Sequence, residues 1–309
     1  MPFLQLTPQT FSSLPPHPSL GNNDSSSSSP SLEKFLISAL TEAQTFITQT
    51  IPQTFIPDPK PRSSSPSSAK VQLLTRTIRE KDYWVCRKSV HNNAAEKGSA
   101  SWAEFERGLR ENHSENEMAY TPSVSSVEHL SQWPVQKVLG DGWRDVDMHI
   151  NMITHSFKPG ALISPRTFIS LVISAYEPPQ QSRNNNSSSQ SSTQGFYTIQ
   201  IPLAFNEQSD IPDGLKNKIK SAVPKKTIFA HYASVEHVLL KEHTSPGHNI
   251  NDDAQKRRIE WTMATVSDAG GHIPQWVQRS WTMGGVPKAV VADVGLFLGW
   301  TDQQRHKSP

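Results

Sequence analysis

Five segments rich in β-branched and aromatic residues follow one another from residue 146 onward, and a segment with apolar residues along one side closes the chain. We predict strands at residues 146–157, 166–176, 196–205, 228–240 and 257–266. The closing segment predicts a helix in two pieces, 274–282 and 287–300, on either side of Gly284 and Gly285. Strands in series with the long helix last predict an α+β fold rather than alternating βαβ units. A curved antiparallel sheet around one helix is too wide for that helix to fill, so we also expect an elongated hydrophobic cavity.

Two further features precede these five strands in the chain. Residues 83–91 are dense in aromatic and β-branched side chains and predict an early strand. Ser101 and Glu104 then form a Ser-x-x-Glu capping box, which predicts the start of a helix with Trp102 and Phe105 on its apolar face. A further short helix is predicted at residues 213–223.

The N-terminal part of the chain differs in composition. Its first thirty residues are rich in proline and serine, and they offer too little apolar area to offset the entropy cost of ordering. Apolar residues then recur at three- and four-residue steps, which predicts an amphipathic helix that either docks on the main domain or binds elsewhere. We therefore predict a disordered tail at residues 1–30, the amphipathic helix at 31–50 and a Pro/Ser linker at 51–70. The main domain is predicted at 71–301, with a disordered Ser/Asn-rich loop at 178–195 inside it, and a C-terminal tail follows at 302–309.

Charge and cysteine content exclude several classes of protein. Lys and Arg number 30 against 28 Asp and Glu, so there is no overall positive field to attract nucleic acid. A single cysteine, Cys86, excludes an internal disulfide and a cysteine-based zinc cluster. No export or import signal is readable, and the most apolar stretch, 286–300, is interrupted by Lys288 and Asp293 and is shorter than the roughly 20 residues of a membrane span. We expect a cytoplasmic protein, or one peripheral at membranes.

Four segments carry a resemblance to a known family. WVCRKSVH, SASWAEFERGLRENH, ISPRTFISLVISAY and RRIEWTMATVSDAGGHIPQWV, in this order, resemble a fungal family of uncharacterised proteins in the START-like lipid-transfer superfamily. The resemblance covers residues 71–300. It implies a helix-grip fold, in which the sheet wraps the C-terminal helix around a tunnel for a sterol, a phospholipid or another hydrophobic molecule. The insertion at 182–194 and the N-terminal extension depart from the family pattern.

Polar residues within apolar strands are the candidates for ligand binding. His149 and His155 share one face of a predicted strand and could face a carboxylate across the sheet. An unpaired charge in such a strand is costly, so the charged residues there are either paired, at strand ends, or polar anchors for a ligand. Tryptophans on the closing helix either pack in the core or reach the tunnel. The predicted ligand-binding residues are Arg87, His149, His155, Arg166, His231, Glu260, Trp276 and Trp281.

Three hypotheses for function remain open. Because dinucleotide, phosphate-loop, zinc-protease and nucleophile-elbow motifs are absent, we expect no cofactor and no metal. The first hypothesis is a non-enzymatic carrier or sensor of a hydrophobic molecule, for which a lysine cluster could touch an anionic membrane (Lys216, Lys218, Lys220, Lys225 and Lys226). The second is a cofactor-independent cyclase or dehydratase acting on a polyketide-like substrate, which a cavity-facing histidine beside a carboxylate such as Glu236 would favour. The third is an adaptor whose N-terminal helix recruits a partner.

Overall fold

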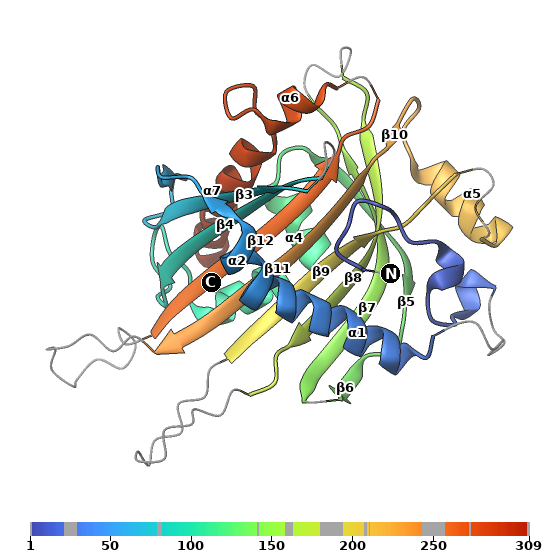
Figure 1. The fold of residues 1–309 in the computed structure, drawn as a ribbon, viewed down its shortest axis with the longest axis horizontal. Coiled ribbons are helices and arrows are strands. Elements are labelled where there is room, and N and C mark those ends of the chain that lie inside the picture. Colours follow the sequence, from blue (N-terminus) through green and yellow to red (C-terminus); the bar gives the residue numbers. More distant parts are fainter. Residues whose placement is uncertain are drawn as a thin grey trace, which may run out of the picture.

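One curved sheet forms the centre of the molecule (Figure 1). The structure, a computed structural model, describes residues 2–21, 30–78, 82–140, 142–157, 163–179, 194–206, 209, 211–242, 257–271 and 273–307. Within them, twelve strands join the sheet: β1 (Ile56–Pro57), β2 (Arg62–Ser63), β3 (Lys70–Thr77), β4 (Tyr83–Asn92), β5 (Val124–Gln132), β6 (Gln136–Leu139), β7 (Trp143–His155), β8 (Arg166–Tyr176), β9 (Gln194–Pro202), β10 (Ile228–Phe229), β11 (His231–Glu242) and β12 (Arg257–Asp268).

The main strands of the sheet follow one continuous path. The path is β1-β3-β4-β12-β11-β9-β8-β7-β5, and its neighbours are all antiparallel. The strands β7, β8 and β9 follow one another as hairpins, whereas β12 joins the first part of the sheet to the last by pairing with both β4 and β11. Register shifts between β5 and β7 mark irregularities that add bend to the sheet.

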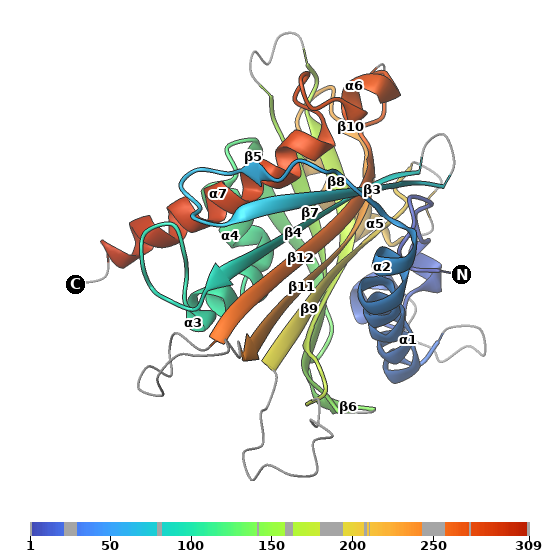
Figure 2. The same ribbon diagram turned by 60° about the vertical axis from the view of Figure 1, so that its left-hand side comes forward.

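The helices lie on both faces of this sheet (Figure 2). Their bounds are α1 (Leu32–Thr45), α2 (Ile51–Thr54), α3 (Trp102–Phe105), α4 (His113–Tyr120), α5 (Asp213–Ala222), α6 (Gln275–Arg279) and α7 (Val286–Arg305). The long helix α7 lies against the inner face together with α3 and α4, and its side chains Val294, Phe297 and Leu298 are fully buried there. The predicted α+β helix-grip fold, with a curved antiparallel sheet around a long C-terminal helix, is confirmed.

The outer face of the sheet is covered by α1. Leu36, Leu40 and Ala43 are at most 1% exposed and pack in the same apolar cluster as the outward-facing residues of β8 and β9. Every second residue of a strand faces the same way, and β8 buries residues of both parities, so both of its faces are covered. Of the two alternatives for the N-terminal helix, docking on the main domain is the one observed.

Two predictions about the N-terminal part need correction. Residues 2–21 are not a free tail: Leu4, Phe11, Leu14 and Leu20 are buried, because the sparse apolar residues between the prolines fit the edge of the α1 layer. The predicted linker at 51–70 contains α2 and the short strands β1 and β2, which pair with β3 and are satisfied by its backbone groups. Most of the predicted loop at 178–195 lies outside the described residues.

Other differences concern where elements begin and end. The C-terminal helix continues five residues past Trp300, into the predicted tail. The capping box of Ser101 and Glu104 is formed, as predicted. A helix, α4, and two strands, β5 and β6, occupy a region in which the sequence pattern predicts no helix or strand. No helix among the described residues has the length and apolar content to cross a membrane.

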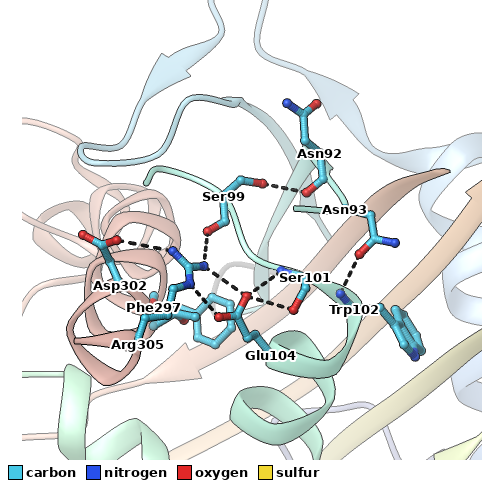
Figure 3. A network of polar contacts seen from close by, with 10 residues as sticks. Asn92, Asn93, Ser99, Ser101, Trp102, Glu104, Phe297, Asp302 and Arg305 are labelled. Carbon is cyan, nitrogen blue, oxygen red and sulfur yellow. Dashed lines mark hydrogen bonds and ion pairs between the residues drawn. The ribbon is translucent and has the colours of Figure 1, made fainter. Parts of the chain in front are cut away.

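A polar network holds the C-terminal end of α7 to the start of α3 (Figure 3). The Arg305 guanidinium donates to both carboxylate oxygens of Glu104, at 2.6 and 3.0 Å, and to the carbonyl of Ser99 at 2.8 Å. Glu104 also accepts from the backbone N–H and the hydroxyl of Ser101. The capping box thus does two things: it starts α3 and it anchors α7.

Arg305→Lys should lower the free energy of unfolding by about 1–3 kcal/mol, because a lysine cannot make the paired bonds of a guanidinium. Chemical denaturation of the variant and the wild type measures this difference. The neighbouring exposed residue gives the control, His306→Gln, which should be neutral. A loss below about 0.5 kcal/mol for the lysine variant would mean that the network does not fasten the helix.

Candidate functional site

An internal cavity of about 530 Å³ lies between the inner face of the sheet and α7. Alternate residues of the central strands line it, as the pleat of a sheet requires: Trp261, Met263, Thr265 and Ser267 from β12, and Tyr232, Ser234 and Glu236 from β11. Val286, Ala289, Val290 and Asp293 line it from α7. This is the place, between the sheet and the closing helix, where the order of elements predicts a cavity.

One end of the cavity reaches the surface near α6. The lining residues Phe157 and Met283 are 37% and 59% exposed, and they come from the end of β7 and the α6–α7 connection. Gly285 keeps this connection tight: an added Cβ would lie 2.3 Å from the carbonyl oxygen of Gln278. We call this end, lined by Phe157, Ile273, Val277 and Met283, the mouth.

The opposite end of the cavity holds a buried ion pair. The Glu236 carboxylate accepts from the Arg87 guanidinium at 3.2 Å and from the indole N–H of Trp261 at 2.7 Å. Arg87 is 2% exposed, and its guanidinium carbon lies 3.8 Å from the centroid of the Trp261 ring, so it is held by charge and by stacking. Strands β4, β11 and β12 supply one residue each, which makes the pair a product of the sheet register.

His113 brings a titratable group to the same carboxylate from α4. Its Nε2 lies 3.4 Å from the second carboxylate oxygen of Glu236. Burial alone would lower the pKa of His113, but the hydrogen bond and charge of Glu236 outweigh it and raise this pKa. Burial alone would raise the pKa of Glu236, but His113 and Arg87 together lower it. Glu236 is therefore an ionised carboxylate between two bases.

Two further carboxyl groups, Glu117 on α4 and Asp293 on α7, line the same end. Burial raises the pKa of Glu117, and it raises the pKa of Asp293 to about 7. Glu117 and Glu236 add to the shift at Asp293, while Arg87 opposes it. We call Arg87, His113, Glu117, Glu236 and Asp293 the polar cluster. No group of three or more His, Cys, Asp and Glu side chains in the described part of the chain could hold a metal ion.

The structure brings two of the eight predicted ligand-binding residues to the cavity, Arg87 and His155. His155 lies toward the mouth, where burial lowers its pKa to about 4 and its Nδ1 is 3.1 Å from the Ser123 hydroxyl. It is therefore neutral at physiological pH. Arg87 is at the buried end, as a polar anchor would be.

The other six predicted residues lie elsewhere, which corrects their assignment to this cavity. His149 is six residues from His155 along β7, or about 20 Å, where it contacts Asp147 and does not line the cavity. Sheet alternation turns His231 and Glu260 away from the cavity, and Glu260 pairs with Lys241 at the surface. Arg166 starts β8 and donates to the carbonyls of Ser164 and Ala269.

The two tryptophans of the closing segment are also outside the cavity. Trp276 is 64% exposed on α6, beside the mouth. The Trp281 ring lies against the Arg62 guanidinium, 4.6 Å from centroid to carbon, in a groove on the outer side of α7. The positions of both tryptophans depend on the α6–α7 connection, whose course the apolar periodicity of the sequence does not define.

Sequence reasoning missed the contribution of α4. His113, Glu117 and Tyr120 recur at four- and three-residue steps and line the cavity from one helix face. Apolar periodicity is the usual signal for a packed helix, but here the buried face is polar. The spacing of His113, Glu117 and Tyr120 was the sequence feature that could have indicated a polar buried face on this helix.

A known family model matches most of the chain. Residues 84–301 match the model of a family described as "Protein of unknown function (DUF3074)". The chain belongs to this family. The matched region contains β4 without its first residue, β5 to β12, and α7 as far as Thr301. It therefore includes the whole cavity lining, whereas α1 lies before it.

Other comparisons add little to the family assignment. No curated protein matches the sequence. Among solved structures, the chain is similar to "Human StAR-related lipid transfer protein 5", with a TM-score of 0.47 and 10% identity over 88% of this chain and 97% of that one.

Proposed function

We propose that this protein binds one hydrophobic small molecule or lipid in the cavity, as a carrier or a sensor. The observation that carries the proposal is the cavity itself, which has an apolar mouth at the surface and a polar cluster at the buried end. Ligand sites in proteins have this composition: apolar walls give affinity, and a few fixed polar groups give orientation. A sterol, a phospholipid or a similar molecule fits this description.

Unpartnered polar atoms support a ligand at the buried end. Among the described residues, Arg87 Nε and Nη1, His113 Nδ1 and Glu117 Oε2 are buried without a hydrogen-bond partner. A buried polar atom that lacks a partner costs about 1–3 kcal/mol. Polar groups of a bound ligand would remove this cost, and the apolar remainder of the ligand would lie along the strands toward the mouth.

Native mass spectrometry tests the proposal. The protein is purified from a eukaryotic host, and whatever co-purifies is extracted and identified. Ala289→Phe places a ring in the cavity from α7, whereas Ala292→Phe makes the same change on the same helix in the outer groove. We expect a stoichiometric ligand in the wild type and in Ala292→Phe, and its loss in Ala289→Phe. If the wild type is empty and takes up nothing from a lipid mixture, the proposal is wrong.

A second candidate function rests on the pair of His113 and Glu236. An imidazole held by a carboxylate beside a substrate cavity is the arrangement of a general base, and a carboxyl with a raised pKa, such as Glu117, can supply a proton. A cofactor-independent cyclase or dehydratase acting on a polyketide-like substrate would use such a pair. If the extracted ligand is converted on incubation with the wild type but not with His113→Gln, the enzyme is the better description; unchanged recovery favours the carrier.

Membrane contact, cellular location and partner recruitment stay predictions. Contact of the α5 lysines with an anionic membrane, and a cytoplasmic location, are both consistent with ligand exchange through the mouth. Recruitment of a partner by α1 is less well supported, since the apolar side of this helix already packs on the sheet.

A further inference from the structure

We infer that the ligand carries a protonated amine at its polar end, held between Glu117 on α4 and Asp293 on α7. The inference rests on the proposed function and specifies its ligand class. It starts from the charges that face the cavity. Among the described lining residues there are three carboxyl groups (Glu117, Glu236 and Asp293), one guanidinium (Arg87) and two imidazoles (His113 and His155).

The two bases at the buried end share one carboxylate. Arg87 and His113 both contact Glu236, which is one acidic group between two basic ones. His155 has a pKa lowered to about 4 and adds no charge at neutral pH. Glu117 and Asp293 remain, and neither forms an ion pair within the described residues. The buried end therefore has an excess of acidic groups over basic ones.

Unpartnered polar atoms, observed independently of the charge count, indicate that a ligand occupies this end of the cavity. Arg87 is 2% exposed and His113 is 8% exposed, and both line the cavity with buried nitrogen atoms that have no partner. Glu117 has a buried oxygen in the same condition. Unpaired donors and an unpaired acceptor thus line the same cavity, from β4 and from α4.

The charge of the ligand follows from the cost of burial. Moving an ion out of water costs several kcal/mol unless a counter-ion meets it. A carboxylate ligand would meet two further carboxyl groups and could bind only if these groups, or the ligand, stayed protonated. An ammonium group would ionise Glu117 and Asp293 and pair with them. An amine is therefore the head group that this cavity stabilises best.

The free donors of Arg87 add a second requirement. Its Nε and Nη1 lack an acceptor, while its Nη2 already pairs with Glu236 at 3.2 Å. A neutral oxygen, such as a hydroxyl or a carbonyl next to the amine, satisfies these donors without adding charge. The ligand class is thus a hydrophobic amine with a neighbouring oxygen.

The pairing makes binding depend on pH. Asp293 faces Arg87 from β4, His113, Glu117 and Tyr120 from α4, and Glu236 from β11. With its pKa near 7 in the free protein, Asp293 must lose a proton before it pairs with an ammonium. The affinity for an amine should therefore weaken by up to about tenfold for each pH unit below about 6, and should level off above about 7. An alkylamine stays charged throughout, since its pKa is about 10.

A matched series of probes tests the inference: dodecylamine, 1-dodecanol and dodecanoate, which share one alkyl chain. Titration calorimetry below the critical micelle concentration gives their affinities for the full chain. We expect the amine to bind at least about tenfold more tightly than dodecanoate at pH 7. If no probe binds, the proposed function itself is in doubt; if the alcohol and the acid bind as tightly as the amine, the cavity binds hydrophobic molecules but the amine inference is wrong.

Conservative variants locate the effect. Asp293→Asn and Glu117→Gln keep the side-chain shape, and each should weaken amine binding by about tenfold while changing 1-dodecanol binding by less than about threefold. Asp293→Asn should also remove most of the pH dependence. Glu115→Gln is the control, because Glu115 is exposed on the same helix and does not line the cavity. Equal losses in Glu115→Gln would assign amine binding to the surface and overturn the inference.

Discussion

Replacing Arg87 with methionine should lower the free energy of unfolding by about 3–5 kcal/mol, the largest loss we expect from one substitution in the cavity. Methionine keeps most of the apolar stem but removes the guanidinium that pairs with Glu236 at 3.2 Å and stacks on Trp261. The Glu236 carboxylate would then be buried with one cation partner fewer. Urea or guanidinium denaturation at pH 7 measures the difference.

The pH dependence identifies the cause of the loss. Arg87 and His113 lower the pKa of Glu236, so the pair contributes stability above the unfolded pKa of about 4.3, and this contribution disappears as the pH falls through the folded pKa. The gap between wild type and Arg87→Met should therefore narrow in acid. The double variant Arg87→Met with Glu236→Gln should recover part of the loss, because no unpaired charge is left. A loss that is the same at every pH would point to packing against Trp261 instead.

Most of the sheet and the closing helix could be predicted from the sequence. Strand β8 begins and ends at the predicted residues 166 and 176, because its apolar run is bounded by Pro165 and Glu177. The break at Gly284 and Gly285 was predicted as well, and it has a local cause: Gly284 has a positive φ and Gly285 has no room for a Cβ. Signals of this kind are local in sequence, so they can be read without the fold.

Elements with a polar buried side could not be predicted in the same way. Helix α4 buries His113 and Ser114 rather than an apolar stripe, since the cavity takes the place of a core. Strand β5 has a mixed burial pattern and register shifts, so its alternation is broken. The packing of residues 2–21 depends on a few separated apolar side chains such as Leu14, whose partners lie far along the chain.

The site depends on pairing that only the register determines. Arg87, Arg166 and Glu260 look alike in the sequence, as charges within apolar strands. Their surroundings in the fold differ: Arg87 faces the cavity, Arg166 binds carbonyls at a strand end, and Glu260 is paired at the surface. A shift of one residue in the pairing of β12 would exchange Glu260 with Trp261 at the cavity. Residue type suggested a polar anchor, but only the register selected Arg87.

The second large effect concerns the outer layer of the sheet. Leu40→Ala should lower the free energy of unfolding by about 2–5 kcal/mol, because Leu40 is fully buried between α1 and the outer face of the sheet and the substitution leaves a cavity there. A helix attached only through a flexible linker would show almost no loss, since it could detach without unfolding the domain. Denaturation followed by the intrinsic tryptophan fluorescence measures the loss; Trp84, one of the eight tryptophans, is buried in this layer with its ring 4.8 Å from that of Phe46.

The control lies on the same helix. Lys34→Ala changes an exposed side chain of α1 and should alter stability by less than about 0.5 kcal/mol. A large loss in Leu40→Ala with a single cooperative transition would mean that α1 folds as one unit with the sheet, although it lies outside the residues that match the family. A small loss, or a separate early transition, would mean that α1 opens independently; its apolar face would then be available to a partner, and the adaptor hypothesis would regain support.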